Sequence, residues 1–263
     1  MSGAERDIDR EAAMPPVLTT EEKERYRRQL MMPQIGARGQ QRIKRGRVLI
    51  AGLGGLGSIT AYYLAAAGVG HLKIADMDRV ALHNLNRQIL HASHDIDTLK
   101  TESARARLTA LNPLCHVEAL TGRIDHDSVG AMVSGCDLIM DGTDNIGTRR
   151  VLNRAALAAN IPFIFGAVGG FDGMVTTFIP GRSACLECLF PAGTHGSHEE
   201  TGVIGPAAGV IASLQSTEAL KILMGQGADL AGAVIHFHGR GMRIKKTLVD
   251  PDPECPVCHG ASR

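Results

Sequence analysis

Tryptophan is absent from this 263-residue chain, and the other aromatic residues are few, with six phenylalanines and three tyrosines. Proteins that bind single-stranded nucleic acid commonly stack its bases on aromatic rings, so this shortage disfavours that class. A charge excess is also missing, because 28 lysines and arginines face 27 aspartates and glutamates, a net charge of +1. The chain offers no overall attraction for nucleic acid or an anionic membrane, and we predict neither as a partner.

A secretory signal peptide is missing as well. Residues 1–20 have mixed charge and no apolar stretch, so we predict a flexible leader and a cytoplasmic protein. Residues 48–70 carry no charged side chain and are long enough to span a bilayer. That segment contains six glycines, however, so a buried strand, a tight turn and a buried helix explain it better than a membrane helix.

Strand-like and helix-like segments alternate along the chain. We expect strands at 48–52, 71–76, 116–120, 137–141 and from Pro162, with helices at 58–67, 101–112, 125–133 and 148–160. This alternation predicts an α/β fold with a Rossmann-like, doubly wound and mostly parallel sheet. An N-terminal helical arm should cover 21–46, with Thr19 capping a helix that continues to about Met31 and a short second helix at 40–44.

The rhythm changes after Gly166. A hairpin with its turn at Asp172-Gly173 is expected there, then a polar loop over 192–202 and a helix over 206–223. Two antiparallel strands at 233–239 and 242–249 should close the sheet. We therefore expect a single domain over 21–263.

A glycine-rich loop joins the first expected strand to the first expected helix of the sheet. Gly52, Gly54 and Gly57 form the pattern GxGxxG, and Gly55 lies in the same loop. Glycines there permit a tight turn and close approach of a phosphate to the backbone, next to a helix N-terminus that favours negative charge. Asp76 ends the next strand, where a carboxylate can bind ribose hydroxyls. Together they predict a nucleotide site without separating ATP from NAD or FAD.

Further polar residues follow at the expected strand ends. Arg87 and Lys100 are suited to bind phosphates, and Asn84 lies in the same polar stretch, although a solvated loop is the simpler alternative. Asp144 follows the strand at 137–141, at the edge where open α/β sheets bind ligands. It can hold Mg²⁺ against phosphates or merely cap the next helix.

Six cysteines in a chain without a secretory signal are predicted to be thiols or metal ligands rather than disulfides. Two CxxC pairs, Cys185 with Cys188 and Cys255 with Cys258, predict one closed tetrahedral zinc site with a structural role. One CxxC alone could instead be redox-active. Cys115 and Cys136 lie in apolar surroundings and are expected in the core. The histidines show no convincing metal spacing, and we interpret them as structural; those concerned are His71, His83, His91, His236 and His238.

These motifs, in this order, resemble the ThiF/HesA/MoeB adenylyltransferases, bacterial relatives of ubiquitin-activating enzymes. The resemblance runs from Arg25 to Cys258. It rests on RYRRQLMMPQIGARGQ at 25–40, VLIAGLGGLGS at 48–58, IADMDRVALHNLNRQ at 74–88, DGTDN at 141–145, TGVIGPAAGVIASLQSTEALK at 201–221 and both CxxC pairs.

The resemblance implies Mg²⁺- and ATP-dependent adenylation of the C-terminal glycine of a small ubiquitin-like sulfur-carrier protein ending in Gly-Gly, with release of pyrophosphate. Position by position, the glycine loop and Asp76 would hold the nucleotide. Asn84, Arg87 and Lys100 would contact its phosphates, and Asp144 would bind Mg²⁺. Arg28 would reach the ATP of the partner subunit in a homodimer. Residues 47–166 would then be the nucleotide-binding half, and 167–263 the carrier-binding and zinc half.

Two departures from the family pattern stand out. Asp97-Thr98-Leu99 precede Lys100 where the family often has Gly and Pro. Sulfur-transferring members carry a cysteine before the GVIGP segment, where this chain has His198, and residues 189–210 contain no cysteine. We therefore expect adenylation with no covalent cysteine step. The alternatives are adenylation of a peptide or small carboxylate, an NAD-dependent Rossmann oxidoreductase, and a non-catalytic zinc-stabilised binding protein.

Overall fold

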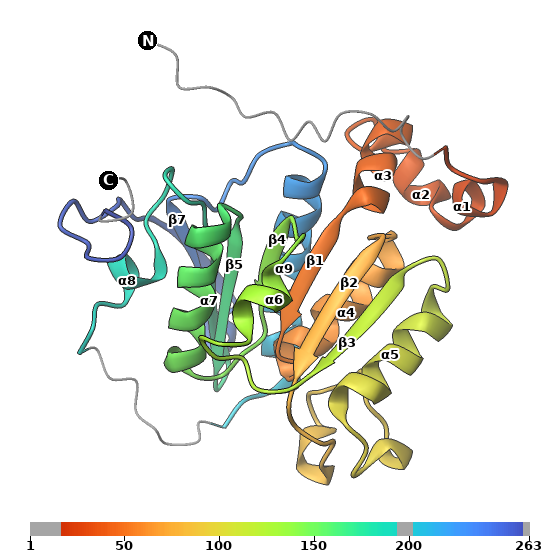
Figure 1. Ribbon diagram of the computed structural model, residues 1–263, viewed down its shortest axis with the longest axis horizontal. Helices are drawn as coiled ribbons and strands as arrows, with labels where there is room; N and C mark the ends of the chain where they lie inside the picture. Colours follow the sequence, from red (N-terminus) through yellow and green to blue (C-terminus); the bar gives the residue numbers. More distant parts are fainter. Residues whose placement is uncertain (1–16, 194–201, 260–263) are drawn as a thin grey trace.

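The computed structural model describes residues 17–193 and 202–259, and it is built around one eight-stranded sheet in the order β3-β2-β1-β4-β5-β6-β7-β8 (Figure 1). Strands β1 to β5 are parallel, and β6, β7 and β8 are antiparallel. The expected doubly wound, mostly parallel sheet with antiparallel C-terminal strands is confirmed. The strands are β1 (Arg47–Ala51), β2 (His71–Asp76), β3 (His116–Thr121), β4 (Leu138–Asp141), β5 (Phe163–Gly169), β6 (Asp172–Phe178), β7 (Ala233–His238) and β8 (Arg243–Leu248).

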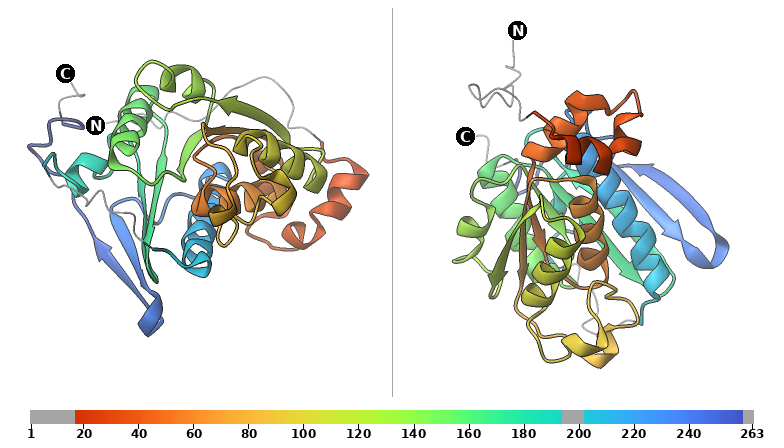
Figure 2. Two further views of the ribbon diagram at one scale, coloured as in Figure 1. Left: turned by 90° about the horizontal axis from the view of Figure 1, so that it is seen from below. Right: turned by 90° about the vertical axis from the view of Figure 1, so that its right-hand side faces the viewer.

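Helices cover both faces of the sheet, as the views in Figure 2 show for α7 and α9. On one face, α4 (Gly55–Ala67), α5 (Lys100–Leu111) and α9 (Gly205–Leu223) enclose one apolar core; on the other, α6 (Val129–Val133) and α7 (Ile146–Ala159) enclose a second. Successive residues of a strand point to opposite faces. Val48 and Ile50 accordingly enter the first core, and Leu49 and Ala51 enter the second.

The N-terminal arm consists of α1 (Thr20–Arg25), α2 (Arg27–Leu30) and α3 (Gly36–Arg45). Thr19 caps α1 in a reciprocal capping box with Glu22, as expected. The single helix predicted from Thr19 to Met31 is wrong, because the chain breaks at Tyr26. The buried Tyr26 hydroxyl accepts a hydrogen bond from Asn112 Nδ2 at 2.9 Å, and the break turns this side chain into the core.

The predicted helix at 125–133 begins only at Val129. The Asp125 carboxylate accepts hydrogen bonds from the backbone amides of Asp127 and Ser128, and this local turn replaces the first helical turn. The hairpin turn also differs from the prediction. Gly169 pairs with Asp172, so the turn is Gly170-Phe171 rather than Asp172-Gly173. Gly170 has φ +58°, a conformation that glycine adopts without strain.

None of the helices within the described ranges is long and apolar enough to cross a membrane. The uncharged segment 48–70 forms β1, a turn and α4 instead, as predicted. The predicted leader falls mostly on residues 1–16, which lie outside the described residues.

Candidate nucleotide site and cysteine cluster

The glycine loop packs backbone against backbone. Gly52 follows β1 with φ +89°, and a Cβ there would lie 2.7 Å from the Gly142 carbonyl oxygen beyond β4. A Cβ on Gly57 would lie only 1.8 Å from the Gly52 carbonyl oxygen. β1 lies between β2 and β4 in the sheet, so the loop is at the point where the strand order reverses. Ligands of open α/β sheets bind in the crevice at this point.

The start of α4 is packed less tightly than Gly52 and Gly57. Gly54 is the N-cap residue, and a Cβ there would make only ordinary contacts, 3.7 Å from Gly142 O. Gly55 begins the helix, three residues earlier than predicted. Glycine offers no side chain to cap the free backbone N–H groups of this 13-residue helix, so they can receive an anion.

Asp76 lies beside this loop, and Lys100 lies beside Asp78, two residues further along the chain. The half-buried Asp76 carboxylate accepts hydrogen bonds from Leu53 N at 2.7 Å and Asp78 N at 2.8 Å. Lys100, the first residue of α5, is buried, and its Nζ lies 2.9 Å from Asp78 Oδ2. Asp97, where the family often has glycine, adopts a left-handed conformation with φ +68°.

Asn84 and Arg87 lie in the segment between β2 and α5. Asn84 is buried and accepts a hydrogen bond from Ala81 N at 3.1 Å, which shapes the 3₁₀ turn Leu82–Asn84. The half-exposed Arg87 donates from Nη1 to His83 O at 2.9 Å and to Asn86 Oδ1 at 3.1 Å. Its guanidinium has further N–H groups for a ligand.

Asp144 is exposed in the loop that follows β4. The neighbouring Asn145, not Asp144, caps α7, because Asn145 Oδ1 accepts a hydrogen bond from Thr148 N at 2.8 Å. The capping alternative for Asp144 is therefore wrong. Its carboxylate faces solvent at the carboxyl end of the sheet, and carboxylate oxygen is a ligand type that Mg²⁺ accepts.

Sequence reasoning missed two residues, Arg149 and Gln215, that support the loop after β4. Arg149 lies 2.9 Å from the buried Asp141 carboxylate through Nε and donates from Nη2 to Thr143 O and Gly166 O. Gln215 of α9 donates from the other face to Asp141 O at 2.9 Å. The only signal in the sequence was Asp141 itself, a carboxylate at the end of an expected strand. That signal does not reveal that Arg149 and Gln215 are its partners.

Arg28 is not brought to this site within the chain. It is exposed on α2, and its neighbour Tyr26 packs on Gly68 at the C-terminal end of α4. The glycine loop lies at the other end of α4, about 20 Å away at 1.5 Å per residue. Figure 1 shows the arm at the end of the molecule where β1 begins.

The four cysteines of the CxxC pairs meet in one cluster. Cys185 precedes α8 (Leu186–Leu189), its sulfur lies 3.7 Å from that of Cys255, and Cys188 lies 3.5 Å from Cys258. All four sulfurs lie within 4.8 Å of one another. Tetrahedral zinc with bonds of about 2.3 Å spaces its sulfurs by about 3.8 Å, so the donor set fits this metal. The cluster could therefore hold a metal ion.

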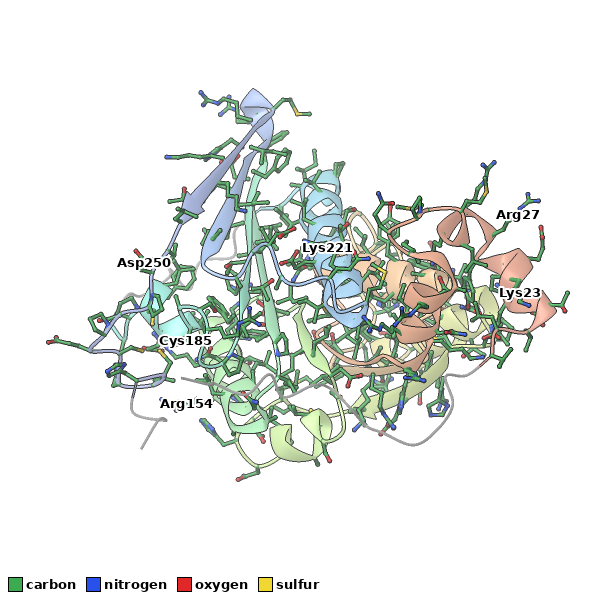
Figure 3. The ribbon with its side chains drawn as sticks, turned by 90° about the horizontal axis from the view of Figure 1, so that it is seen from above. Lys23, Arg27, Arg154, Cys185, Lys221 and Asp250 are labelled. Carbon is green, nitrogen blue, oxygen red and sulfur yellow. The ribbon has the colours of Figure 1, made fainter. Side chains whose placement is uncertain are left out.

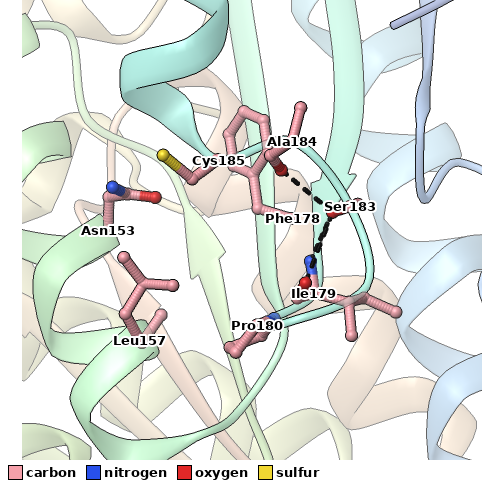
Figure 4. A pocket seen from close by; sticks show the side chains of 9 residues that line it. Asn153, Leu157, Phe178, Ile179, Pro180, Ser183, Ala184 and Cys185 are labelled. Atoms are coloured by element: carbon pink, nitrogen blue, oxygen red, sulfur yellow. Dashed lines mark hydrogen bonds between the residues drawn. The ribbon is translucent and has the colours of Figure 1, made fainter. Parts of the chain in front are cut away.

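Helix α7 positions this cluster. Arg150 Nε lies 3.1 Å from Glu187 Oε2, and Asn153 Oδ1 accepts a hydrogen bond from Leu186 N at 3.1 Å. Figure 4 shows a small pocket beside Cys185, between Asn153 and Leu157 on one side and Phe178 on the other. Most of the residues that line this pocket are apolar. In Figure 3 the cluster, marked by Cys185, lies at the opposite end of the molecule from Lys23 and Arg27 of the arm.

Cys115 and Cys136 are both buried in the core, as predicted. Burial raises the pKa of the Cys115 thiol to about 12. Burial likewise raises the pKa of Cys136 to about 11. Neither thiol is a ready nucleophile at neutral pH, since the thiolate is the reactive form. His198 lies outside the described residues.

A doubly wound sheet with a glycine loop at its switch point and a carboxylate after the second strand defines a nucleotide-binding α/β protein. The model of the ThiF family matches residues 26–257, and the chain belongs to that family. The resemblance inferred from the motifs is thereby confirmed.

Two curated relatives and one solved structure illustrate the similarity. The chain is 41% identical to the sulfur carrier protein adenylyltransferase of Thermus thermophilus over 91% of this chain and 92% of the relative. It is 39% identical to the sulfur carrier protein ThiS adenylyltransferase of Escherichia coli, over 90% of this chain and 96% of the relative. A crystal structure of E. coli MccB with MccA-N7isoASN shares the fold, with a TM-score of 0.80, 23% identity, and coverage of 89% of this chain and 74% of MccB.

Proposed function

We propose that this protein adenylates the C-terminal glycine carboxylate of a small ubiquitin-like sulfur-carrier protein, using ATP and Mg²⁺ and releasing pyrophosphate. The proposal is supported by the order of the elements: the glycine loop, Asp76 and Asp144 each lie at or after the carboxyl end of a parallel strand, and Lys100 pairs with Asp78, two residues beyond Asp76. Relatives named as sulfur-carrier adenylyltransferases, matched along nearly their whole length, support the choice of substrate.

The reaction needs charge neutralisation more than proton transfer. The carrier carboxylate is already ionised, so it can attack the α-phosphorus of ATP without a general base. Attack on an anionic phosphate and departure of pyrophosphate both build up negative charge, which cations stabilise. Arg87 and Lys100 would contact phosphate oxygens, with Asn84 and the loop amides as further donors. Mg²⁺, held by Asp144, would supply additional charge neutralisation when bound.

Lys100 and Asp78 form an ion pair that ATP must compete with or rearrange. The Asp78 side chain is 56% exposed, whereas that of Lys100 is 6% exposed. The exposed partner can therefore turn toward solvent while Lys100 keeps its place, which allows the ammonium group to bind a phosphate instead.

Arg28 would complete the site of the partner subunit in a homodimer. Its position at the far end of α4 from the glycine loop supports this role, because the arm does not reach its own loop. Mixing Arg28→Ala subunits with Lys100→Ala subunits should restore part of the activity, since one site of the heterodimer keeps both residues. Absence of rescue after co-expression would contradict the role across the interface.

The four cysteines would hold one structural zinc ion, and residues 167–263 would form the carrier-binding half. The buried, protonated state of Cys115 and Cys136 supports release of the acyl-adenylate to a separate sulfur donor, with no covalent cysteine step. We also propose a cytoplasmic location.

Carrier-dependent exchange of radioactive pyrophosphate into ATP tests the function. Asp144→Ala should abolish exchange while the circular dichroism spectrum stays unchanged, because the side chain is exposed. Asp229→Ala is the matched control: Asp229 is also exposed and pairs with Lys221 near the end of α9, so exchange should persist. Full exchange in Asp144→Ala, or binding of NAD without binding of ATP, would contradict the proposal.

A further inference from the structure

The amide side chain of Gln88 lies beside the start of α4. Gln88 is 4% exposed, and its Nε2 would lie 3.9 Å from a Cβ on Gly54, the N-cap residue of that helix. The preceding residue, Arg87, lies in the same way along Gly55, since a Cβ there would be 3.7 Å from Arg87 Cγ. Two consecutive residues of the segment between β2 and α5 thus flank two consecutive residues of the glycine loop.

The backbone of Gln88 is hydrogen bonded at both ends, whereas its side-chain oxygen is not. The backbone N–H donates to Asn84 O at 2.9 Å, and the backbone carbonyl accepts from His91 N at 3.1 Å. The side-chain Oε1 is buried and has no hydrogen-bond partner among the residues that the structure describes. The backbone therefore fixes the residue in place, and the amide keeps unused hydrogen-bonding capacity.

The position of this amide indicates where its partner binds. A buried polar atom without a partner costs stability, and a methionine of nearly the same length would fill the space without that cost. The amide stands at the N-terminus of α4, a 13-residue helix whose free N–H groups favour an anion. Two independent features, the helix end and the unpartnered amide, thus point to one ligand at the glycine loop.

The chemistry of the ligand follows from the two ends of the amide. Nε2 is the end next to Gly54, and it is a donor, which suits phosphate oxygens because they accept hydrogen bonds. Oε1 is an acceptor and needs a donor. Waters held by Mg²⁺ are donors that arrive together with Mg-ATP. A nucleotide phosphate group with its metal ion therefore supplies partners for both ends.

We propose that Gln88 is a nucleotide-binding residue, whose Nε2–H group donates a hydrogen bond to a phosphate oxygen of ATP at the start of α4. The inference rests on the proposed function only in that ATP occupies the glycine loop. The contact adds a neutral donor to the cations proposed at Arg87 and Lys100. Because it is made to phosphate, it should not affect a ligand that has the base and ribose alone.

Two substitutions of nearly unchanged length test the contact. Gln88→Met removes the amide, and Gln88→Glu replaces its NH₂ group by a carboxylate oxygen. By calorimetry we expect Gln88→Met to raise the Kd for Mg-ATP about tenfold, as the loss of one hydrogen bond to a charged group predicts. Gln88→Glu should raise it about a hundredfold, because a negative charge then faces the phosphates. The affinity for adenosine should stay unchanged in Gln88→Met.

Thermal unfolding without nucleotide separates binding from packing. Gln88→Met removes an unpartnered buried atom, so its Tm should equal that of the wild type or exceed it by up to about 4 °C. Thr177→Val is the matched control. Thr177 is fully buried on β6, which β4 and β5 separate from β1, and its Oγ1 also has no partner within the described part of the chain. This variant should shift Tm in the same direction and leave Mg-ATP affinity unchanged.

Three results would overturn the inference. The first is a Kd for Mg-ATP in Gln88→Met equal to that of the wild type, and the second is equal weakening of Mg-ATP and adenosine. The third is a lower Tm or a failure to fold in Gln88→Met, because the amide would then serve the fold and not the ligand.

The two proposals fail in different ways. Wild-type protein that binds Mg-ATP but shows no carrier-dependent exchange would contradict the proposed function, while the Mg-ATP affinities of the variants would still decide the role of Gln88. Normal exchange in the wild type together with unchanged Mg-ATP affinity in Gln88→Met would contradict the role of Gln88 alone. Wild-type protein that does not bind Mg-ATP would contradict both.

Discussion

The glycine loop and the cysteine cluster are both built from chain segments that are distant in sequence, but they are held together in different ways. At the glycine loop, the backbones after β1 and β4 touch because Gly52, Gly57 and Gly142 have no side chains. At the cluster, four sulfurs join α8 to the C-terminal segment, and Asp252 N adds a hydrogen bond to Cys188 Sγ at 3.4 Å. The glycine loop depends on residues without side chains, whereas the cluster depends on four sulfur atoms. Substitutions at the two sites should therefore change stability and Mg-ATP affinity differently.

The largest loss of stability is expected from adding a side chain at Gly57, where the backbone touches that of Gly52. In Gly57→Ala the new Cβ would lie 1.8 Å from a backbone oxygen, and backbone cannot move aside as a flexible side chain can. We expect a loss of more than about 5 kcal/mol of stability, enough to prevent folding. Urea unfolding followed by circular dichroism measures it.

Gly54→Ala is the matched control within the same loop. Its Cβ would meet only ordinary contacts, so the protein should fold with nearly normal stability. Mg-ATP affinity should still fall, because the Cβ would stand beside the free N–H groups at the start of α4, where we expect the phosphates to bind. If Gly57→Ala folded as well as Gly54→Ala, the packing account of the loop would be wrong.

An intermediate effect is expected at the cysteine cluster. Cys255→Ser removes one buried thiol of the proposed zinc site, and metal-binding energy is coupled to folding, so we expect a loss of about 4 kcal/mol of stability. Elemental analysis should show one zinc per wild-type chain and less in the variant. Mg-ATP affinity of the folded fraction should stay unchanged, because none of the four cysteines is among the residues proposed to bind the nucleotide.

A metal-free wild-type protein, purified without chelator, would contradict the zinc assignment. A large drop in Mg-ATP affinity in Cys255→Ser would instead show that the two sites are coupled, and would break the distinction between them.

The smallest effect is expected from the two core cysteines. Replacing Cys115 and Cys136 together by Ala should leave exchange activity unchanged and cost about 1–2 kcal/mol of stability from lost packing. Their raised pKa values, about 12 and about 11, keep both as thiols at pH 8. Iodoacetamide should therefore not label them in the native protein, as peptide mass spectrometry can check. A thioester or persulfide on either residue after turnover would contradict the absence of a cysteine step.

The sheet was predictable because each parallel strand is a short apolar run between turn signals, and β2 begins and ends at the predicted residues. The cysteine cluster was predictable from spacing alone, since two CxxC pairs leave few alternatives. The break at Tyr26 was not, because it depends on Asn112, 86 residues away. Arg149 and Gln215 were missed for the same reason: their partners are backbone or side-chain atoms that only the folded chain brings near.

Gly68 lies where the N-terminal arm meets the C-terminal end of α4. It ends α4 in a left-handed conformation with φ +90°, and a Cβ there would lie 2.5 Å from the Tyr26 ring. Gly68 thus both ends α4 and provides the surface against which Tyr26 of the arm packs. Any side chain at position 68 would displace Tyr26 and, two residues on, Arg28, while the nucleotide loop at the other end of α4 kept its shape. If Arg28 completes the partner subunit's site in a homodimer, as proposed, a substitution at Gly68 would lower the activity of the partner's site and spare the site of the chain that carries it.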